Sequence, residues 1–271
     1  MTIAARDWRL IREEARPGPL NMALDETAAR TAADGGPRTV RVYSWSPSTL
    51  SLGYNQAPET VAWDHCRDHD VSVVRRQTGG GGIYHDAVGD ISYSISVPRD
   101  ELPGDLMDAY HVLLEPILGA FDRMGIDARL VDDEQPALHE PACYLRPLHP
   151  AHDLVAGPDG RKISGNAQYR MRDAVVQHGS LSYALQPDRH LATFTDPPVT
   201  DDEFRGRVTS IHQEAGIERD AAVDALENAL KEWADATTGA WTADELDAAR
   251  ELATAKYEAD AWNRDRTDPT D

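Results

Sequence analysis

RRQTGGGGIYHD, residues 75–86, is the most informative stretch of this sequence. Its four consecutive glycines follow a predicted strand, so backbone N–H groups can turn toward one point and a ligand can approach closely. Two arginines precede the glycines and favour an anionic ligand, a carboxylate or a phosphate. No helix with GK[ST] follows, and the pattern is not the Rossmann fingerprint. On composition alone, a flexible glycine-rich turn is an equal alternative.

Alternating strands and amphipathic helices flank this loop on both sides. Strands are predicted where apolar and polar residues alternate, and helices where apolar residues recur at helical spacing. This order of elements predicts an α+β fold. The predicted strands are 39–45, 49–54, 71–76, 91–98, the two arms of a hairpin within 152–170, and 174–185; the predicted helices are 18–33, 61–70, 105–124, 220–237 and 242–262; 130–150 is predicted to be a loop, 197–214 a link and 263–271 a disordered tail.

The composition is strongly acidic and poor in lysine. The 271 residues carry a formal net charge of −20, which disfavours broad nucleic-acid binding because that binding needs a basic surface. Acidic residues spread along the whole chain indicate a salt-rich cytosol, where a highly charged surface is screened and hydrated. An ordinary acidic protein is the alternative. The 41% hydrophobic content is enough for a core.

Nothing in the sequence predicts a membrane location or an oxidising compartment. No run of about 18 apolar residues occurs, and MTIAARDWRL (1–10) lacks the apolar centre of a signal peptide. Two cysteines, Cys66 and Cys143, are too few for a disulfide framework. We therefore expect a cytoplasmic protein.

Lys162 is one of only three lysines, in a chain that otherwise carries its positive charge as arginine. It lies in GPDGRKISGNAQ (157–168). A lysine offers a compact charge on a flexible stem, whereas arginine is a planar fork that needs more room. A solvated turn would accept arginine equally well, so the lysine indicates a functional position rather than a surface turn.

Three motifs in this order, RRQTGGGGIYHD (75–86), KISGNAQYR (162–170) and VVQHGS (175–180), resemble the lipoate–protein ligase A and octanoyltransferase family. PLNMALDE and YSWSPSTLSLGYNQ look like its N-terminal segments, and VTSIHQEAG and KYEADAWN like its closing ones. The Gly-Arg-Gly-Arg loop of the related biotin ligases is absent. The resemblance runs from about residue 8 to about residue 263.

The resemblance implies a mixed β-sheet flanked by helices around a narrow tunnel for a medium-length acyl chain. It implies a catalytic domain over 1–214 and a short helical lobe over 215–263, before the tail at 264–271. It also implies a reaction, the attachment of lipoate or octanoate to one lysine of a lipoyl carrier domain. Such domains belong to the E2 subunit of 2-oxoacid dehydrogenases and to the H protein of glycine cleavage.

The resemblance also implies site residues. Lys162 takes the place of the lysine that contacts the acyl carbonyl and the phosphate, where a positive group stabilises the oxyanion. For His85 and Asp86 a loop-stabilising hydrogen-bond pair is an equal alternative, and His178 alone would be read as a core histidine. No metal site is implied. The substrate- or nucleotide-binding positions are Arg75, Arg76, Thr78, Gly79, Gly80, Gly81, His85, Asp86, Asp153, Ser164, Gly165, Asn166, Ala167, His178 and Gly179.

Two chemistries share this scaffold, and the sequence favours the first. A lipoate–protein ligase makes acyl-AMP from the free acid with ATP and Mg²⁺; it fits the retained Asp153 and a buried, inert Cys143. A cysteine-dependent transferase needs no cofactor and would use Cys143, in PACYLRP (141–147), as nucleophile near Lys162 and Arg146. The ligase would act with a separate accessory chain if it is of the two-chain kind, and the transferase would take its acyl group from an acyl carrier protein.

Two further alternatives come from other classes. His139, Cys143, His149 and His152 could form a zinc site, but their spacing matches no common zinc pattern. A non-catalytic acyl-binding protein is the second alternative, and the intact glycine loop with Lys162 argues against it.

Overall fold

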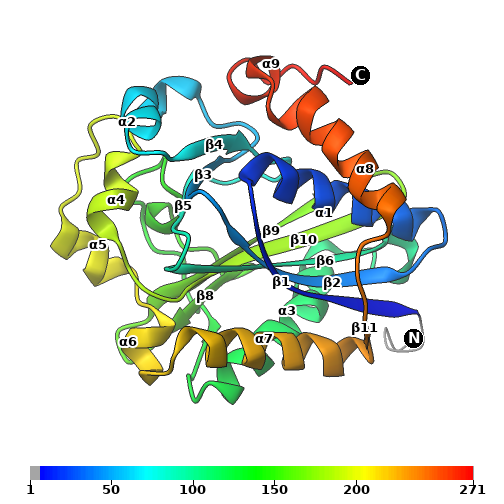
Figure 1. Ribbon diagram of the computed structural model, residues 1–271. Helices are drawn as coiled ribbons and strands as arrows, with labels where there is room; N and C mark the ends of the chain where they lie inside the picture. The colour runs from blue at the N-terminus through cyan, green and yellow to red at the C-terminus, as the bar shows by residue number, and fades with distance from the viewer. Residues whose placement is uncertain (1–6, 271) are drawn as a thin grey trace.

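A mixed eight-stranded sheet runs through the middle of the molecule (Figure 1). The computed structural model describes residues 7–270. Strands β11, β1 and β2 are parallel neighbours, and the remaining strands pair antiparallel. The predicted α+β fold is confirmed. In spatial order the strands are β11 (Thr237–Thr238), β1 (Trp8–Arg16), β2 (Arg38–Trp45), β6 (Asp90–Pro98), β10 (Ala174–Ser182), β9 (Arg161–Arg170), β8 (Asp153–Ala156) and β7 (Arg129–Leu130).

A second, three-stranded sheet carries the glycine-rich loop. Strand β3 (Thr49–Leu52) lies between β4 (Ser72–Arg75), which is parallel to it, and β5 (Ile83–His85), which is antiparallel. Since β4 leads into the glycines and β5 leaves them, the loop connects the two outer strands of this sheet. The small sheet therefore fixes both ends of the loop.

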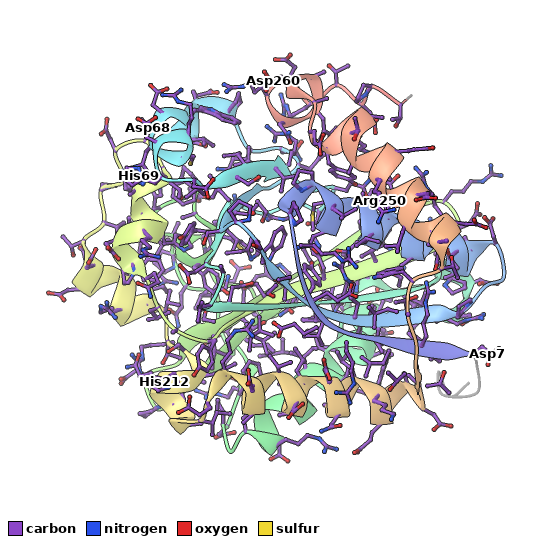
Figure 2. All side chains as sticks on the ribbon, viewed as in Figure 1. Asp7, Asp68, His69, His212, Arg250 and Asp260 are labelled. Atoms are coloured by element: carbon purple, nitrogen blue, oxygen red, sulfur yellow. The ribbon has the colours of Figure 1, made fainter. Side chains whose placement is uncertain are left out.

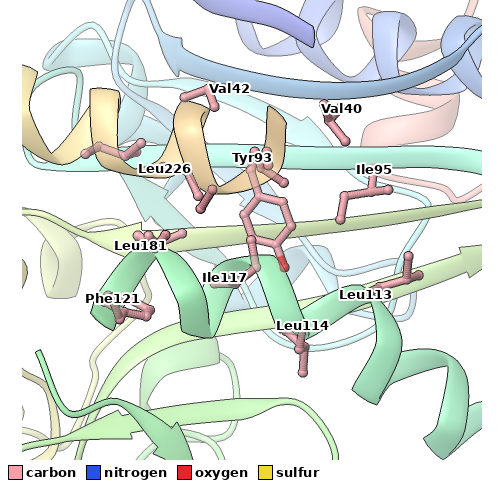
Figure 3. Close-up of a cluster of buried hydrophobic side chains, with 14 of the residues drawn as sticks. Val40, Val42, Tyr93, Ile95, Leu113, Leu114, Ile117, Phe121, Leu181 and Leu226 are labelled. Atoms are coloured by element: carbon pink, nitrogen blue, oxygen red, sulfur yellow. The ribbon is translucent and has the colours of Figure 1, made fainter. Parts of the chain in front are cut away.

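Helices cover both faces of the large sheet, as Figure 1 shows. On one face α3 (Leu106–Arg123) and α7 (Arg219–Ala234) pack on the strands through the main apolar core. On the other face α1 (Gly18–Ala33) and α8 (Ala243–Leu252) form a second core. Figure 3 shows the first of these cores, in which strand residues such as Tyr93 meet helix residues at helical spacing. The helix residues labelled there are Leu113, Leu114, Ile117, Phe121 and Leu226.

Local signals explain where these helices begin. Asp105 caps α3 by accepting a hydrogen bond from the backbone N–H of Met107 at 2.8 Å. Pro19 stands in the first turn of α1, where its missing N–H costs nothing. The predicted helices at 18–33, 61–70 and 105–124 are confirmed, the second as α2 (Trp63–Asp68).

The predicted link at 197–214 is wrong, because it contains α5 (Asp201–Arg207) and α6 (Ile211–Ala215). Thr200 and Glu203 form a capping box, a pattern that the sequence displays and that the prediction overlooked. The charged strand β1 and the short helix α4 (Pro187–Ala192) were also not predicted. Segment 130–150 is largely irregular as predicted, with one 3₁₀ turn at Cys143–Leu145.

The C-terminal segment returns to the beginning of the chain. Strand β11 pairs with β1, and after α8 a π-helical turn, η5 (Ala253–Tyr257), leads to α9 (Asp260–Asn263) beside β4. The predicted division at residue 214 stays a prediction. In the predicted tail, Asp268 forms an ion pair with Lys256 at 2.5 Å; Asp271 and residues 1–6, most of the stretch inspected for a signal peptide, lie outside the described residues.

The surface is acidic and densely charged. Figure 2 shows Asp68, Arg250 and Asp260 at the periphery of the molecule. Within residues 7–270, no helix is both long and apolar enough to span a bilayer.

Candidate active site

A cavity of about 410 Å³ lies between the glycine-rich loop and strands β9 and β10. This volume suits one small ligand. Aromatic and aliphatic side chains line part of the wall, among them Met22, Trp45 and Ile83. Exposed residues of segment 134–152, such as Glu134 and His149, line another part and mark the open end.

Arg76 gives the glycine-rich loop its shape. Its buried guanidinium donates hydrogen bonds to the carbonyl oxygens of Ser51, Gly79 and Gly81, each at 2.8 Å. Gly80 has a φ of +94°, and a Cβ there would stand 2.9 Å from Nη2 of Arg76. Burial lowers the pKa of Arg76. Arg76 therefore holds the loop in a conformation that only glycine adopts without strain.

Lys162 and Asp153 form a buried ion pair in the wall of the cavity. Nζ of Lys162 lies 2.7 Å from Oδ1 of Asp153 and donates to the carbonyl oxygen of Cys143 at 3.0 Å. Burial acts to lower the pKa of Lys162, but Asp153 outweighs it, so the pKa is raised. Burial likewise acts to raise the pKa of Asp153, and Lys162 with His152 outweighs it, so this pKa is lowered. The site therefore presents a fixed ammonium group.

Cys143 lies between the loop and this ammonium. Its N–H donates to the carbonyl oxygen of Gly82 at 2.8 Å, while its carbonyl receives Lys162. A Cβ built on Gly165 would lie 3.5 Å from Sγ of Cys143 and 3.5 Å from Nζ of Lys162, so thiol and ammonium flank the same point. Cys143 is partly exposed and lines the cavity, whereas Cys66 is buried and burial raises its pKa to about 11.

Two histidines are anchored deeper in the wall. Nε2 of His85 lies 2.9 Å from Oγ of Ser51, and its Nδ1 lies 3.0 Å from Oδ2 of Asp90. The ring of His85 also stacks on Trp45, with 4.1 Å between ring centroids. These contacts fix the position of His85 against the apolar wall.

His178 is the second anchored histidine. Its Nε2 lies 2.6 Å from Oγ1 of Thr78, and its Nδ1 lies 3.7 Å from Oδ2 of Asp25. Asp25 in turn accepts from Nη1 of Arg41 at 3.0 Å and from Oγ of Ser94 at 2.6 Å. Burial lowers the pKa of His178, against the opposing effect of Asp25.

Known proteins with the same architecture identify the family. The profile of the lipoyl protein ligase A/B catalytic domain matches residues 17–233. The chain belongs to this family. Two octanoyltransferases named LipM, from Geobacillus kaustophilus and Bacillus subtilis, are 32% and 31% identical to this lipoyl protein ligase A/B family member. Each match covers 96% of this chain, and 99% and 98% of the respective relative.

Solved structures of the family share the fold. A bipartite lipoate protein ligase from Thermoplasma acidophilum, from a structural analysis of that ligase and its E2 lipoyl domain, has a TM-score of 0.79 at 23% identity over 96% of each chain. Lipoate-protein ligase A bound with ATP has a TM-score of 0.78 at 24% identity, over 95% of this chain and 98% of that one. Identities this low establish the fold only. The family resemblance predicted from the motifs is confirmed, and the chain is an enzyme of the lipoate–protein ligase and octanoyltransferase kind.

Most of the predicted site residues meet around the cavity of this family member. Five do not lie on its wall. Thr78 contacts the cavity residue His178 from behind, and Asp86 caps a turn by accepting from the N–H of Gly89 at 2.9 Å. His85 therefore pairs with Asp90, not with Asp86. The predicted residues on the wall are Arg76, Gly79, Gly80, His85, Cys143, Asp153, Lys162, Gly165, Asn166, Ala167, His178 and Gly179; those off it are Arg75, Thr78, Gly81, Asp86 and Ser164.

Arg75 points away from the cavity and fastens the C-terminal segment. It is fully buried, and burial together with Arg266 lowers its pKa to about 10. Its backbone N–H donates to Oδ1 of Asn263 at 2.7 Å. Its side chain donates to the carbonyl oxygens of Gly53, Tyr54, Gln56, Trp262 and Asn263.

Sequence reasoning missed several residues of the site. Trp45 and Ser51 sit on predicted strands, and nothing in the alternation distinguishes them from ordinary strand residues. His149 and His152 were named as zinc candidates, and His152 also as the residue before the retained Asp153, where ligases of this family carry asparagine. In the described part of the chain, no three histidine, cysteine, aspartate or glutamate side chains form a metal-binding group.

Proposed function

We propose that this enzyme is a cysteine-dependent acyl transferase, which moves an octanoyl or lipoyl group from a carrier thioester onto a lysine of a lipoyl domain. The observation that carries the proposal is the position of Cys143. Cys143 is partly exposed and lines the cavity, and its Sγ flanks the same point as the Lys162 ammonium.

Two steps follow from this geometry. In the first, the Cys143 thiolate attacks the acyl carbonyl, a new C–S bond forms, the C–S bond to the carrier breaks, and the carrier leaves as its thiolate. In the second, the neutral amine of the acceptor lysine attacks the Cys143 thioester, a C–N bond forms, the C–S bond breaks, and the proton lost by the amine ends on the departing Cys143 sulfur. Lys162 supplies positive charge beside the carbonyl in both steps, where negative charge develops on oxygen.

The relatives support this choice over the ligase that the sequence favoured. The preference for a ligase depended on an inert, buried Cys143, and Cys143 is neither fully buried nor away from the cavity. Relatives at 31–32% identity over nearly their whole length are octanoyltransferases. The retained Asp153 fits either chemistry, because its carboxylate fixes Lys162.

Intact-mass analysis of the enzyme and an apo lipoyl domain tests the proposal. Octanoyl carrier protein without ATP should give an acyl adduct on the enzyme, followed by an acyl mass gain on the domain. Cys143→Ala should abolish both, and Cys66→Ala, the matched control, should keep both. A gain that needs ATP, Mg²⁺ and free acid, and that persists in Cys143→Ala, would instead establish the ligase.

A further inference from the structure

Acyl transfer to a lysine needs a proton acceptor at the cavity. The acceptor lysine is an ammonium ion at neutral pH, and only the neutral amine attacks a carbonyl. Lys162 cannot take this proton. Its Nζ is held as an ammonium by the Asp153 carboxylate and the Cys143 carbonyl. This requirement depends on the proposed function, in which the acyl group waits on Cys143.

Among the described residues, four histidines line the cavity, and in three of them each ring nitrogen faces a polar or charged group. His85 contacts Ser51 and Asp90, and His178 contacts Thr78 and faces Asp25. Both are buried or nearly so, on the side away from solvent. Nδ1 of His149 accepts from the N–H of Ala151 at 3.0 Å, and its Nε2 faces Glu134 at 3.8 Å.

His152 is the fourth histidine and differs from the others. Its Nδ1 is buried without a hydrogen-bond partner and lies 3.6 Å from Oδ1 of Asp153. The side chain is about one third exposed, with a relative exposure of 34%, and it lines the same cavity as Cys143. With the proton on Nδ1, facing the carboxylate, Nε2 keeps its lone pair.

We propose that His152 is the general base that removes the proton from the acceptor lysine. The ammonium gives one proton to Nε2 of His152, and the neutral amine then attacks the thioester carbonyl. As the tetrahedral intermediate collapses, the C–S bond breaks. The remaining extra N–H proton passes to the departing thiolate of Cys143, and His152 releases its own proton to solvent. Asp153 orients the ring, so one carboxylate serves both the oxyanion-stabilising lysine and the base.

The groups that face His152 fit this role. His149 stacks on it with 5.0 Å between centroids, and Tyr110 of α3 lies 5.6 Å away. The carbonyl oxygen of His152 accepts from Nδ2 of Asn166 at 2.8 Å, which fixes the backbone. Asp153 lies 3.6 Å from Nδ1 of His152 and is itself paired with Lys162, and Arg207 is a further positive neighbour of Asp153.

Transfer from a preloaded enzyme tests this role. The enzyme is first acylated with octanoyl carrier protein, the single adduct is verified by mass, and an apo lipoyl domain is then added over pH 6–9. His152→Asn should load at the wild-type rate and transfer at least about 100-fold more slowly at pH 7. The deficit should shrink as pH rises, because more of the acceptor amine is then neutral without help. Added imidazole should restore transfer in His152→Ala.

The controls separate this inference from the function on which it rests. His212→Asn, an exposed histidine far along the chain (labelled in Figure 2), should leave both steps unchanged. Normal loading with wild-type transfer and an unchanged pH profile in His152→Asn would overturn the role of His152 alone. An equal loss with the same pH change in His149→Asn would also overturn it. A wild-type enzyme that forms no adduct would overturn the proposed function and this inference with it.

Discussion

The surroundings of Lys162 bear on why the chain has a lysine rather than an arginine at this position. The side chain is 2% exposed, and Nζ reaches both a carboxylate and a carbonyl within 3.0 Å. A guanidinium carries the same charge but is a wider, planar group with a different arrangement of donors. We therefore expect the shape of the ammonium to matter as well as its charge.

Substitution of Lys162 tests that expectation. Both Lys162→Ala and Lys162→Arg should lower acyl transfer by at least about 100-fold, the cost of losing one oxyanion-stabilising group. The rate is measured by mass gain on the lipoyl domain. Full activity in Lys162→Arg would mean that charge alone matters.

Asp153→Asn should destabilise the protein, because it leaves a buried ammonium without its partner. The expected loss is about 3–5 kcal/mol of unfolding free energy. The pKa of Asp153 is lower in the folded than in the unfolded chain, so its contribution is complete above about pH 5 and is lost as the pH falls. Denaturant unfolding between pH 3 and pH 7 should show a smaller acid-induced loss in Asp153→Asn than in the wild type; equal losses would contradict the buried pair.

The glycine-rich loop allows a comparison within one motif. Gly80→Ala forces an L-residue to a φ of +94° and brings a Cβ to within 2.9 Å of Arg76. Gly79→Ala has no atom within 4 Å of its Cβ and no positive φ. Gly80→Ala should lose about 1–3 kcal/mol of stability and Gly79→Ala almost none. Equal melting temperatures for the two variants would show that the loop is not held in this conformation.

At the scale of elements, Arg75 joins the small sheet to the C-terminal segment. Arg75→Gln leaves several buried carbonyls without donors, each costing about 1–3 kcal/mol, so the unfolding free energy should fall by at least about 3 kcal/mol. Arg172→Gln, whose side chain is 94% exposed, is the matched control and should change little. A denaturant midpoint equal to that of the wild type would contradict this role of Arg75.

The elements also show what could be predicted from sequence. Helix 105–124 has a clear apolar period, and helix 18–33 has an apolar stripe followed by Gly35, Gly36 and Pro37; both helices were predicted. Strand β1 was missed because it carries Arg9 and Glu13, whose charges are paired by Glu245 and Arg219 from distant segments. Partners of that kind are tertiary, and no local period reveals them.

The candidate site could also be predicted only where its residues carry a local signal. The glycines and Lys162 carry their own signals, so the loop and the ammonium were predicted. Arg75 was matched to the loop, but the sequence does not show which of the two adjacent arginines faces it, because adjacent residues of an extended chain point to opposite faces. Only the structure shows that Arg76 faces the loop and Arg75 the C-terminal segment.

At the scale of the whole molecule, the net charge of −20 should make stability depend on salt. Acidic side chains repel one another at low ionic strength, and screening weakens the repulsion. The melting temperature should rise steadily between about 0.1 M and 2 M KCl, while sucrose of equal osmolarity serves as the non-ionic control. The same rise with both solutes, or none with KCl, would contradict a salt-adapted surface.

The hydrogen bonds between Arg75 and the C-terminal segment have a consequence for the order in which the chain folds during synthesis. The chain leaves the ribosome from its N-terminus, so the glycine-rich loop emerges long before Trp262 and Asn263, which hold the strand that leads into it. Likewise, β1 can pair with β11 only after residues 237–238 have been synthesised. A nascent chain can therefore build its central sheet early. A chain whose synthesis stops short of α9 lacks the groups of residues 262–263 that bind Arg75, so the strand that leads into the glycine-rich loop loses these contacts.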